Sequence, residues 1–355
     1  MKGRSNMSND PRGWLNWAIQ MLDPSPLYTH LFAGMKTDTE IMDLFTLIHQ
    51  DQPNLVLFFS TINFLVFNEP DNPFAAFYPY LRQEPRPAED AYPFFRAFCL
   101  THMDELRSLL PTARLQTNEV TRCANLLPAF GLVYHSGGGK SLAAIELGAS
   151  AGLNLNWDRY QYIYDNVQTL GEDPSVQIHC TLRGDSFPPF PRTMPTVASR
   201  VGIELAPLDI KNERDVNWMR ACIWPEELWR YQCLDAALAF ARQYPPNVLA
   251  GDACELLPGV LTGISPEQTI CIWHSFALNQ GPASVRESVE QTLIDFSRER
   301  AIYRVSLELD PTNPALLDPH LEIYTYDRGK RSSSKSLATT AIHGEWLQWH
   351  LEPSL

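Results

Sequence analysis

The spacing of apolar and polar positions divides the chain into a helical first part and a second part in which strands and helices alternate. In the first part, apolar residues recur on one helix face or form long apolar runs, which predicts helices. These helices are expected around residues 41–48 and at 54–68, 92–110 and 118–134. After residue 141, short apolar runs that end at small or polar residues predict strands, with helices between them. The strands are expected at 142–147, 176–182, 197–205, 247–250, 268–273, 302–307, 321–326, 336–342 and 346–351, and the helices at 153–160, 215–244 and 282–300.

Strands that alternate with helices indicate an α/β domain with a mostly parallel sheet, helices on both faces and right-handed crossovers. The last strands, with a turn at Arg328-Gly329-Lys330, predict an antiparallel hairpin that closes this sheet. We therefore expect an α/β domain at residues 140–355, preceded by an all-helical lid or substrate domain at residues 1–139. Gly139-Lys140-Ser141 joins the two and is not a P-loop, because Tyr134 replaces the earlier glycine and a strand follows the segment instead of preceding it.

The amino-acid composition predicts a sizeable hydrophobic core and an acidic protein. Hydrophobic residues make up 45% of the chain, charged residues 19%, and the formal net charge is -13. So acidic a protein is expected to bind neither nucleic acid nor a membrane surface. Seven cysteines without a C-x-x-C pair indicate reduced thiols and no metal site. The N-terminus lacks a signal-peptide core and the apolar run at 55–67 is too short to span a membrane, so a cytoplasmic protein is expected.

Polar side chains stand at the ends of four successive strands of the predicted parallel sheet. Glu146 is the penultimate residue of the first strand, and the small-residue turn Gly148-Ala-Ser150-Ala-Gly152 follows it. Glu204, Asp252 and His274 end or follow the next three strands. Ligands of such sheets bind beyond the carboxyl ends of the strands. We expect these residues to line one pocket, since three acids close together need a cation or hydrogen-bond donors, although polar strand ends also arise by chance.

The segment Glu146-Leu-Gly148-Ala-Ser150-Ala-Gly152 resembles the first motif of the class I S-adenosylmethionine-dependent methyltransferases, an acid followed by glycines at alternating positions. Ser150 departs from the central glycine of that motif. The resemblance covers about residues 141–355 and implies a Rossmann-like methyltransferase sheet with S-adenosylmethionine as the cofactor. It also implies that Glu146 and the turn at Gly148, Ser150 and Gly152 hold the amino acid end of the cofactor.

The same resemblance assigns the later acids. Glu204 matches the acid that binds the ribose hydroxyls, and Asp252 matches the acid that meets the adenine amino group. The segment between the first motif and Glu204 is longer than is usual in the family, so Asp185 is a rival for the ribose.

The chain is also similar, over most of its length, to a bacterial family catalogued as a domain of unknown function with a methyltransferase-like half. This similarity supports the fold and carries no established activity. The segments that carry it are Gln116-Thr-Asn-Glu119, Glu146-Leu-Gly-Ala-Ser-Ala-Gly-Leu-Asn154, Pro207-Leu-Asp209, Trp224-Pro225 and Gly251-Asp252.

Methyl transfer requires an aligned nucleophile and, for some acceptors, removal of a proton. His274 is the first candidate base, because its reference pKa lies near neutrality; a structural histidine is the alternative. Glu119 is the second catalytic candidate, and Gln116, Asn118 and Asn154 are candidate contacts to a small-molecule substrate. The plain alternative for residues 116–119 is that Thr117 or Asn118 caps the helix that follows.

Two other functions compete with a small-molecule methyltransferase. Gly148-Ala-Ser150-Ala-Gly152 also fits the G-x-S-x-G elbow of serine hydrolases, with Ser150 as nucleophile and Asp252 with His274 or His343 as partners. Hydrolases place several strands before that elbow, whereas here helices precede it. The second alternative is a methyltransferase fold that binds a small molecule or a partner without catalysis. The serine within the loop and the lack of an Asn/Asp-Pro-Pro-Tyr motif after the fourth strand favour it, and the missing motif argues against base or amide N-methylation.

Overall fold

The structure, a computed structural model, describes residues 25–49, 52–309 and 318–350. The chain forms two compact units, the first built from residues up to Thr117 together with Glu213–Gln232, and the second from Asn118–Asn212 and Cys233 onward. This division does not follow the expected boundary after residue 139. The helix α7 (Arg122–Ser136) belongs to the second unit, where it packs on strands of the sheet.

The first unit is helical throughout its described residues. Its helix α4 begins and ends as predicted, whereas the single helix expected at 92–110 is divided at His102, whose backbone leaves the helical region. The helix α9 (Leu228–Gln243) starts in the segment that belongs to this unit. Besides α9, the helical elements of this unit are α2 (Pro26–Met35), α3 (Thr39–Leu44), η1 (Phe45–Leu47), α4 (Asn54–Asn68), η2 (Pro73–Phe77), η3 (Ala88–Asp90), α5 (Tyr92–Thr101), α6 (Met103–Leu109) and α8 (Glu213–Ala221).

The segment 213–232 joins the first unit through specific hydrogen bonds. The carboxylate of Glu226 accepts hydrogen bonds from the Ser25 hydroxyl (2.7 Å) and the Leu27 backbone N–H (2.8 Å) at the start of α2. The side chain of Asn63, in the middle of α4, donates to the carbonyl of Ala221 at 3.1 Å. These bonds satisfy buried backbone groups that would otherwise lack partners, and they explain why a segment far along the chain packs with the first helices.

Asn63 is also the centre of a polar cluster inside the aromatic core of this unit. It donates to the Tyr28 hydroxyl and accepts from the Tyr78 hydroxyl at 2.7 Å. The Tyr28 ring stacks on Phe59 with ring centres 4.1 Å apart. One amide therefore pairs two phenol groups that are fully buried.

The second unit is built on a mixed, mostly parallel sheet. The sheet order is β3-β2-β4-β11-β10-β9-β8-β7-β1-β5-β6. The pairs β10–β11, β9–β10, β8–β9 and β2–β3 are antiparallel, and the other pairs are parallel. The strands are β1 (Leu142–Leu147), β2 (Gln161–Tyr164), β3 (Gln168–Leu170), β4 (Gln177–Arg183), β5 (Val197–Glu204), β6 (Val248–Ala250), β7 (Thr269–Ser275), β8 (Ile302–Glu308), β9 (His320–Asp327), β10 (Lys330–Thr340) and β11 (Trp346–Trp349).

The order of the parallel strands creates a switch point between β1 and β7. In sequence order, β1, β5, β6, β7 and β8 are the first to fifth strands of one continuous parallel region whose spatial order is 3-2-1-4-5. The chain therefore leaves β1 toward one edge and later returns to its other side. Ligands of parallel sheets bind in the crevice that opens at such a point, beyond the carboxyl ends of the strands.

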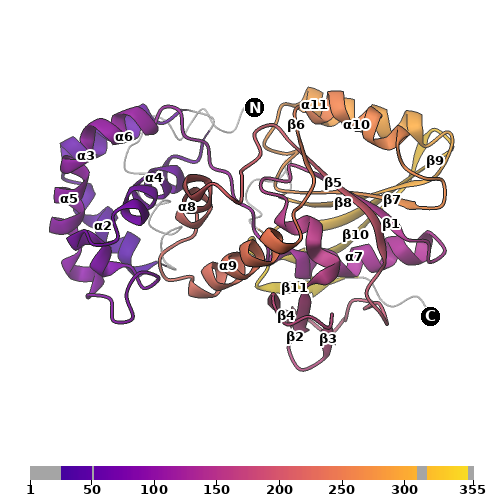
Figure 1. The fold of residues 1–355 in the computed structure, drawn as a ribbon, viewed down its shortest axis with the longest axis horizontal. Coiled ribbons are helices and arrows are strands. Elements are labelled where there is room, and N and C mark those ends of the chain that lie inside the picture. Colours follow the sequence, from indigo (N-terminus) through magenta and orange to yellow (C-terminus); the bar gives the residue numbers. More distant parts are fainter. Residues whose placement is uncertain (1–24, 50–51, 310–317, 351–355) are drawn as a thin grey trace. The chain divides into compact units, whose positions relative to one another are not determined.

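Helices cover both faces of this region, as expected from the alternation of strands and helices. Figure 1 shows α10 (Ala253–Thr262) and α11 (Ala283–Phe296) on one side of the sheet and α7 on the other. A core of aliphatic side chains from β1, β5, β7, α10 and α11 lies on the first side. The hairpin β2–β3 and the helix α10 were not predicted, while the antiparallel β9–β10–β11 end was.

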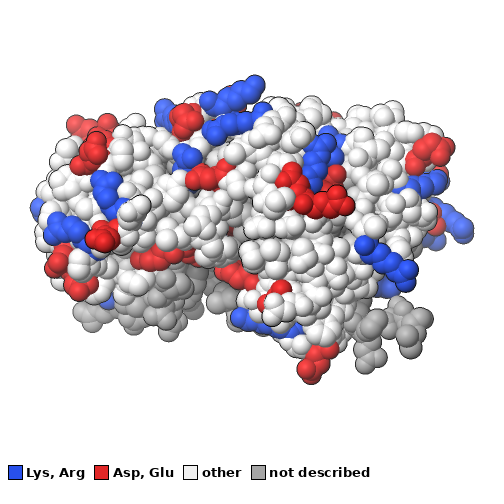
Figure 2. Space-filling view, turned by 60° about the horizontal axis from the view of Figure 1, so that its bottom comes forward, with Lys and Arg blue, Asp and Glu red and all other residues white. Residues whose placement is uncertain are grey.

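Acidic and basic side chains alternate with uncharged surface on the face drawn in Figure 2. Over the described ranges, no helix combines the length and apolar character needed to cross a membrane. The same part of the chain holds no group of three or more His, Cys, Asp or Glu side chains placed to bind a metal ion.

Candidate functional site

The loop after β1 has the backbone shape that its small residues allow. Gly148, Ser150 and Gly152 all have positive φ, at 75°, 51° and 75°. A Cβ on Gly148 would lie 2.4 Å from that of Ala277, and one on Gly152 would lie 2.6 Å from a methyl group of Val248. The two glycines are therefore required by the turn and by close packing, and the serine between them holds a left-handed conformation that costs free energy.

Two of the predicted site residues hold this loop in place. The Ser150 backbone N–H donates to the Glu204 carboxylate at 2.9 Å, and the Leu153 N–H donates to the Asn118 side chain at 3.0 Å. The segment that starts at Leu153 is a 3-10 helix, η4 (Leu153–Arg159), and not an α-helix. Glu204 and Asn118 thus satisfy backbone donors that the turn exposes.

Glu146 is a buried carboxyl group beside the loop. It is 2% exposed, and one of its oxygens accepts a hydrogen bond from the Asn154 side chain at 3.4 Å. Burial raises its pKa to about 8; Glu204 adds to the rise, while Asn154 and the Trp273 side chain oppose it. Near neutral pH this carboxyl group therefore holds its proton, unless a cation arrives to stabilise the ionised form.

Buried polar atoms without partners among the described residues occur on Glu146, on Asn154 that bonds it, on the loop residue Ser150, and on Trp273, whose Nε1 is a donor and which stands opposite Glu146 on β7. Among the described residues, neither the Glu146 Oε2, the Asn154 Oδ1 nor the Ser150 Oγ has a hydrogen-bond partner, and all three are buried. Buried polar atoms are rarely left unpaired, so each one calls for an explanation. The Asn154 Oδ1 is a pure acceptor, and the Glu146 Oε2 becomes one when the carboxyl group ionises, which suits a ligand that brings N–H donors and a positive charge.

The two acids that compete for the ribose role lie in different places. Glu204 ends β5, the direct neighbour of β1, and contacts the loop. Asp185 follows β4, which is separated from β1 in the sheet by β11, β10, β9, β8 and β7. Glu204 therefore lies beside the loop after β1, and Asp185 follows a strand distant from it in the sheet.

Asp252 follows β6 and is the N-cap of α10. Its side chain accepts a hydrogen bond from the Cys254 N–H at 2.8 Å, a standard stabilising contact at a helix start. This bond uses one carboxylate oxygen. The sequence did not predict this structural role, because it did not predict helix α10, and a contact to a ligand would add to it.

His274 forms a buried pair with Glu308, a residue at the end of β8 that the sequence did not single out. The His274 Nδ1 lies 2.7 Å from a Glu308 oxygen, which also accepts from the backbone N–H groups of Ala277 (3.0 Å) and Leu278 (3.2 Å). Glu308 therefore fixes the ring orientation, while the His274 Nε2 has no partner among the described residues. The only sequence signal for Glu308 is an acid at the end of a predicted strand.

The register of the sheet separates His274 from Glu146. Glu146 stands opposite Trp273, and Leu147 stands opposite His274. Residues opposite one another in paired parallel strands point to the same face, and successive residues point to opposite faces. The side chains of Glu146 and His274 therefore lie on opposite faces of the sheet, and the single pocket expected at the strand ends is divided into two places.

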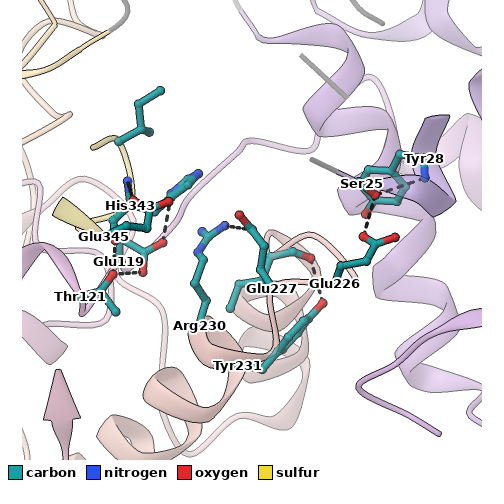
Figure 3. Close-up of polar contacts among 12 residues, drawn as sticks. Ser25, Tyr28, Glu119, Thr121, Glu226, Glu227, Arg230, Tyr231, His343 and Glu345 are labelled. Atoms are coloured by element: carbon teal, nitrogen blue, oxygen red, sulfur yellow. Dashed lines mark hydrogen bonds and ion pairs between the residues drawn. The ribbon is translucent and has the colours of Figure 1, made fainter. Parts of the chain in front are cut away.

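The predicted segment 116–119 is also divided. Gln116 lies in the first unit and Glu119 in the second. Figure 3 shows Glu119 beside Thr121 and His343, and its carboxylate accepts from the Thr121 hydroxyl at 2.7 Å and lies 3.2 Å from the His343 Nδ1. The predicted capping by Thr117 or Asn118 is wrong, because Thr121 occupies the N-cap of α7.

The parts of the alternative hydrolase triad are not assembled. The carboxylate that bonds His274 is Glu308, whereas Asp252 bonds the start of α10. His343 lies beside Glu119. The Ser150 hydroxyl has no hydrogen-bond partner among the described residues, so neither histidine activates it in this arrangement.

Comparison with known proteins gives one match. The model of a protein family described as "Uncharacterized protein conserved in bacteria (DUF2332)" matches residues 18–349. No curated protein and no solved structure matches the chain.

Proposed function

The chain belongs to this bacterial family, and from that premise we propose that it is an S-adenosylmethionine-dependent methyltransferase acting on a small molecule. The observation that carries the proposal is the buried carboxyl group of Glu146, whose Oε2 lacks a partner among the described residues as does the Asn154 Oδ1 beside it, next to a glycine loop at the switch point of a parallel sheet. S-adenosylmethionine carries an ammonium group and a sulfonium centre. Both are positive, and the ammonium group brings N–H donors to the acceptors of Glu146 and Asn154.

The residues around the loop divide the binding task. Glu146 and Asn154 receive the amino acid end, and ionised Glu146 is stabilised by the charge it binds. The Ser150 N–H is already bonded to Glu204, so the loop orients that carboxylate instead of donating to the ligand. Glu204 is then placed to accept from the ribose hydroxyls, and the second oxygen of Asp252 to accept from the adenine amino group.

The bound group supplies an electrophilic methyl, and the protein supplies alignment and, where the acceptor requires it, a base. His274 is the candidate base, since Glu308 holds its Nδ1 and the Nε2 has no partner among the described residues. Because His274 lies on the opposite face from Glu146, the acceptor must approach from the α11 side of β7.

A second function is favoured by that same separation. A protein that binds S-adenosylmethionine or a related nucleoside at Glu146 without transferring its methyl group needs no base near the ligand. The two functions differ in turnover: the methyltransferase produces S-adenosylhomocysteine when supplied with an acceptor, and the binding protein does not.

Calorimetric titration with S-adenosylmethionine and S-adenosylhomocysteine tests the proposal. Wild type is expected to bind both, and Glu146→Gln to weaken binding at least about tenfold, the loss of one charge-assisted contact. Glu172→Gln, which changes an exposed acid in the same unit, is the matched control and should bind as wild type does. Absence of binding by wild type at high micromolar ligand would contradict the cofactor assignment, and unchanged binding by Glu146→Gln would contradict the role of that residue.

A further inference from the structure

The second unit contains a cavity of about 490 Å³ on the α11 side of the sheet. Its floor is formed on β8 by Arg304, Ser306 and Glu308, which alternate along the strand and so share one face. His274 on β7 pairs in register with Ser306 and lies on that face too. The volume is in the range of small-molecule sites.

The acids of this cavity are satisfied by protein groups or by solvent. Glu308 accepts from His274 and from two backbone N–H groups. Glu290 accepts from the Tyr326 hydroxyl at 2.7 Å and pairs with Arg304 at 3.1 Å. Glu322 accepts from the Tyr324 hydroxyl at 2.6 Å, and Glu287 is exposed to solvent. These carboxylates therefore leave little capacity for a cationic ligand.

Two buried side chains of the lining each have one nitrogen atom without a hydrogen-bond partner in the described part of the chain. The Arg304 side chain is held by Glu290 and by the Tyr324 ring, whose centre lies 4.3 Å from its guanidinium carbon, yet its Nε has no hydrogen-bond partner among the described residues. The His274 Nε2 likewise has no hydrogen-bond partner among the described residues. Arg304 is 8% exposed and His274 4%. The Arg304 Nε is a charged N–H donor that is held in place and has no acceptor among the described residues. A carboxylate is the ligand group that would supply such an acceptor.

We propose that this cavity binds a small organic molecule that carries a carboxylate, with Arg304 as its anion-binding residue and His274 beside it. The site is argued from the cavity alone. Its identification with the pocket of the methyl acceptor rests on the proposed function, and under that function it names the substrate class as small carboxylic acids.

Two probes of equal shape and opposite charge test the site on the wild-type chain. Benzoate and benzylamine are titrated separately while the imidazole Cε1–Hε1 signals are followed by NMR, with the His274 signal identified from the His274→Gln spectrum. Benzoate is expected to shift the His274 signal saturably, and benzylamine is expected to leave it in place. A saturable shift with benzylamine and none with benzoate would overturn the proposal, as would no shift with either.

Substitution of the arginine locates the anion contact. Arg304→Gln is expected to weaken benzoate binding about tenfold or more, as for the loss of one charge-assisted hydrogen bond. Arg298→Gln removes an exposed arginine on the same unit and should leave the affinity unchanged. Equal benzoate affinity in Arg304→Gln and wild type would overturn the assignment. Since no cofactor is added, benzoate binding is decided independently of S-adenosylmethionine binding, and either result can fail alone.

Discussion

Replacement of Glu146 by glutamine removes a carboxyl group whose ionisation opposes folding. The pKa of this group is raised from 4.5 to about 8 by burial. Between these values the folded state keeps a proton that the unfolded state has released, so the free energy of unfolding falls as pH rises. The penalty is absent below the unfolded pKa and fully present above the folded one. Glutamine has nearly the same shape and does not ionise.

The size of the effect follows from the pKa difference. Full ionisation costs about 5 kcal/mol, at 1.36 kcal/mol per pKa unit. Between pH 5 and pH 9 the wild-type chain should lose about 4 kcal/mol relative to Glu146→Gln. For a unit of this size that corresponds to a difference of about 8–16 °C in Tm.

Urea denaturation followed by circular dichroism, at several pH values from 5 to 9, measures this difference. Subtracting wild type from Glu146→Gln cancels the other titrating groups, which both chains share. The exposed Glu172→Gln should show a flat difference. The difference in the free energy of unfolding between Glu146→Gln and wild type could instead stay constant within about 1 kcal/mol across this range, which is less than the equivalent of one pKa unit. That result would refute the raised pKa and with it the reason for expecting a cationic ligand.

Further substitutions, with their controls, test the packing around the two sites and in the first unit. Gly148→Ala should lower the free energy of unfolding by about 2–4 kcal/mol, from a positive φ and an overpacked methyl group. Gly138→Ala, with a similar φ and open space around it, should lose only about 1–2 kcal/mol in the same denaturation assay. Glu308→Ala should cost about 1.5–3 kcal/mol in urea denaturation, because the acceptor of an imidazole and two N–H groups is removed; an unchanged midpoint would show that the pair is not formed. Asn63→Leu should cost about 2–5 kcal/mol by leaving two buried hydroxyls unpaired, and adding Tyr28→Phe should recover part of the loss in a double-mutant cycle.

Much of the sheet could be predicted because its strands carry strong local signals. Leu142–Leu147 is a short run that is apolar except for Glu146 and is closed by small residues, and it was predicted with the bounds that the structure gives. The hairpin of Gln161–Tyr164 and Gln168–Leu170 was missed, since such short strands give almost no alternation to detect. The helix Ala253–Thr262 was missed because Pro258 and Gly259 interrupt its pattern, although the surrounding packing tolerates both.

For the candidate site, the sequence could predict which residues lie at the ends of individual strands, but not how their side chains are arranged together. The sequence places Glu146 and His274 at the ends of strands, and the structure confirms both positions. Which face each side chain takes depends on the register of β1 against β7, which is set by long-range pairing. The Glu308 partner of His274 likewise depends on β8 lying beside β7, a contact across more than thirty residues.

Pairing of the Glu146 carboxylate with the positive end of S-adenosylmethionine can be measured by calorimetric titration at pH 7 in two buffers of different ionisation enthalpy. Since the pKa of Glu146 is about 8 before binding, we expect saturable binding with release of close to one proton per site, and no such release in Glu146→Gln. Absence of binding by wild type, or binding without proton release, would contradict it.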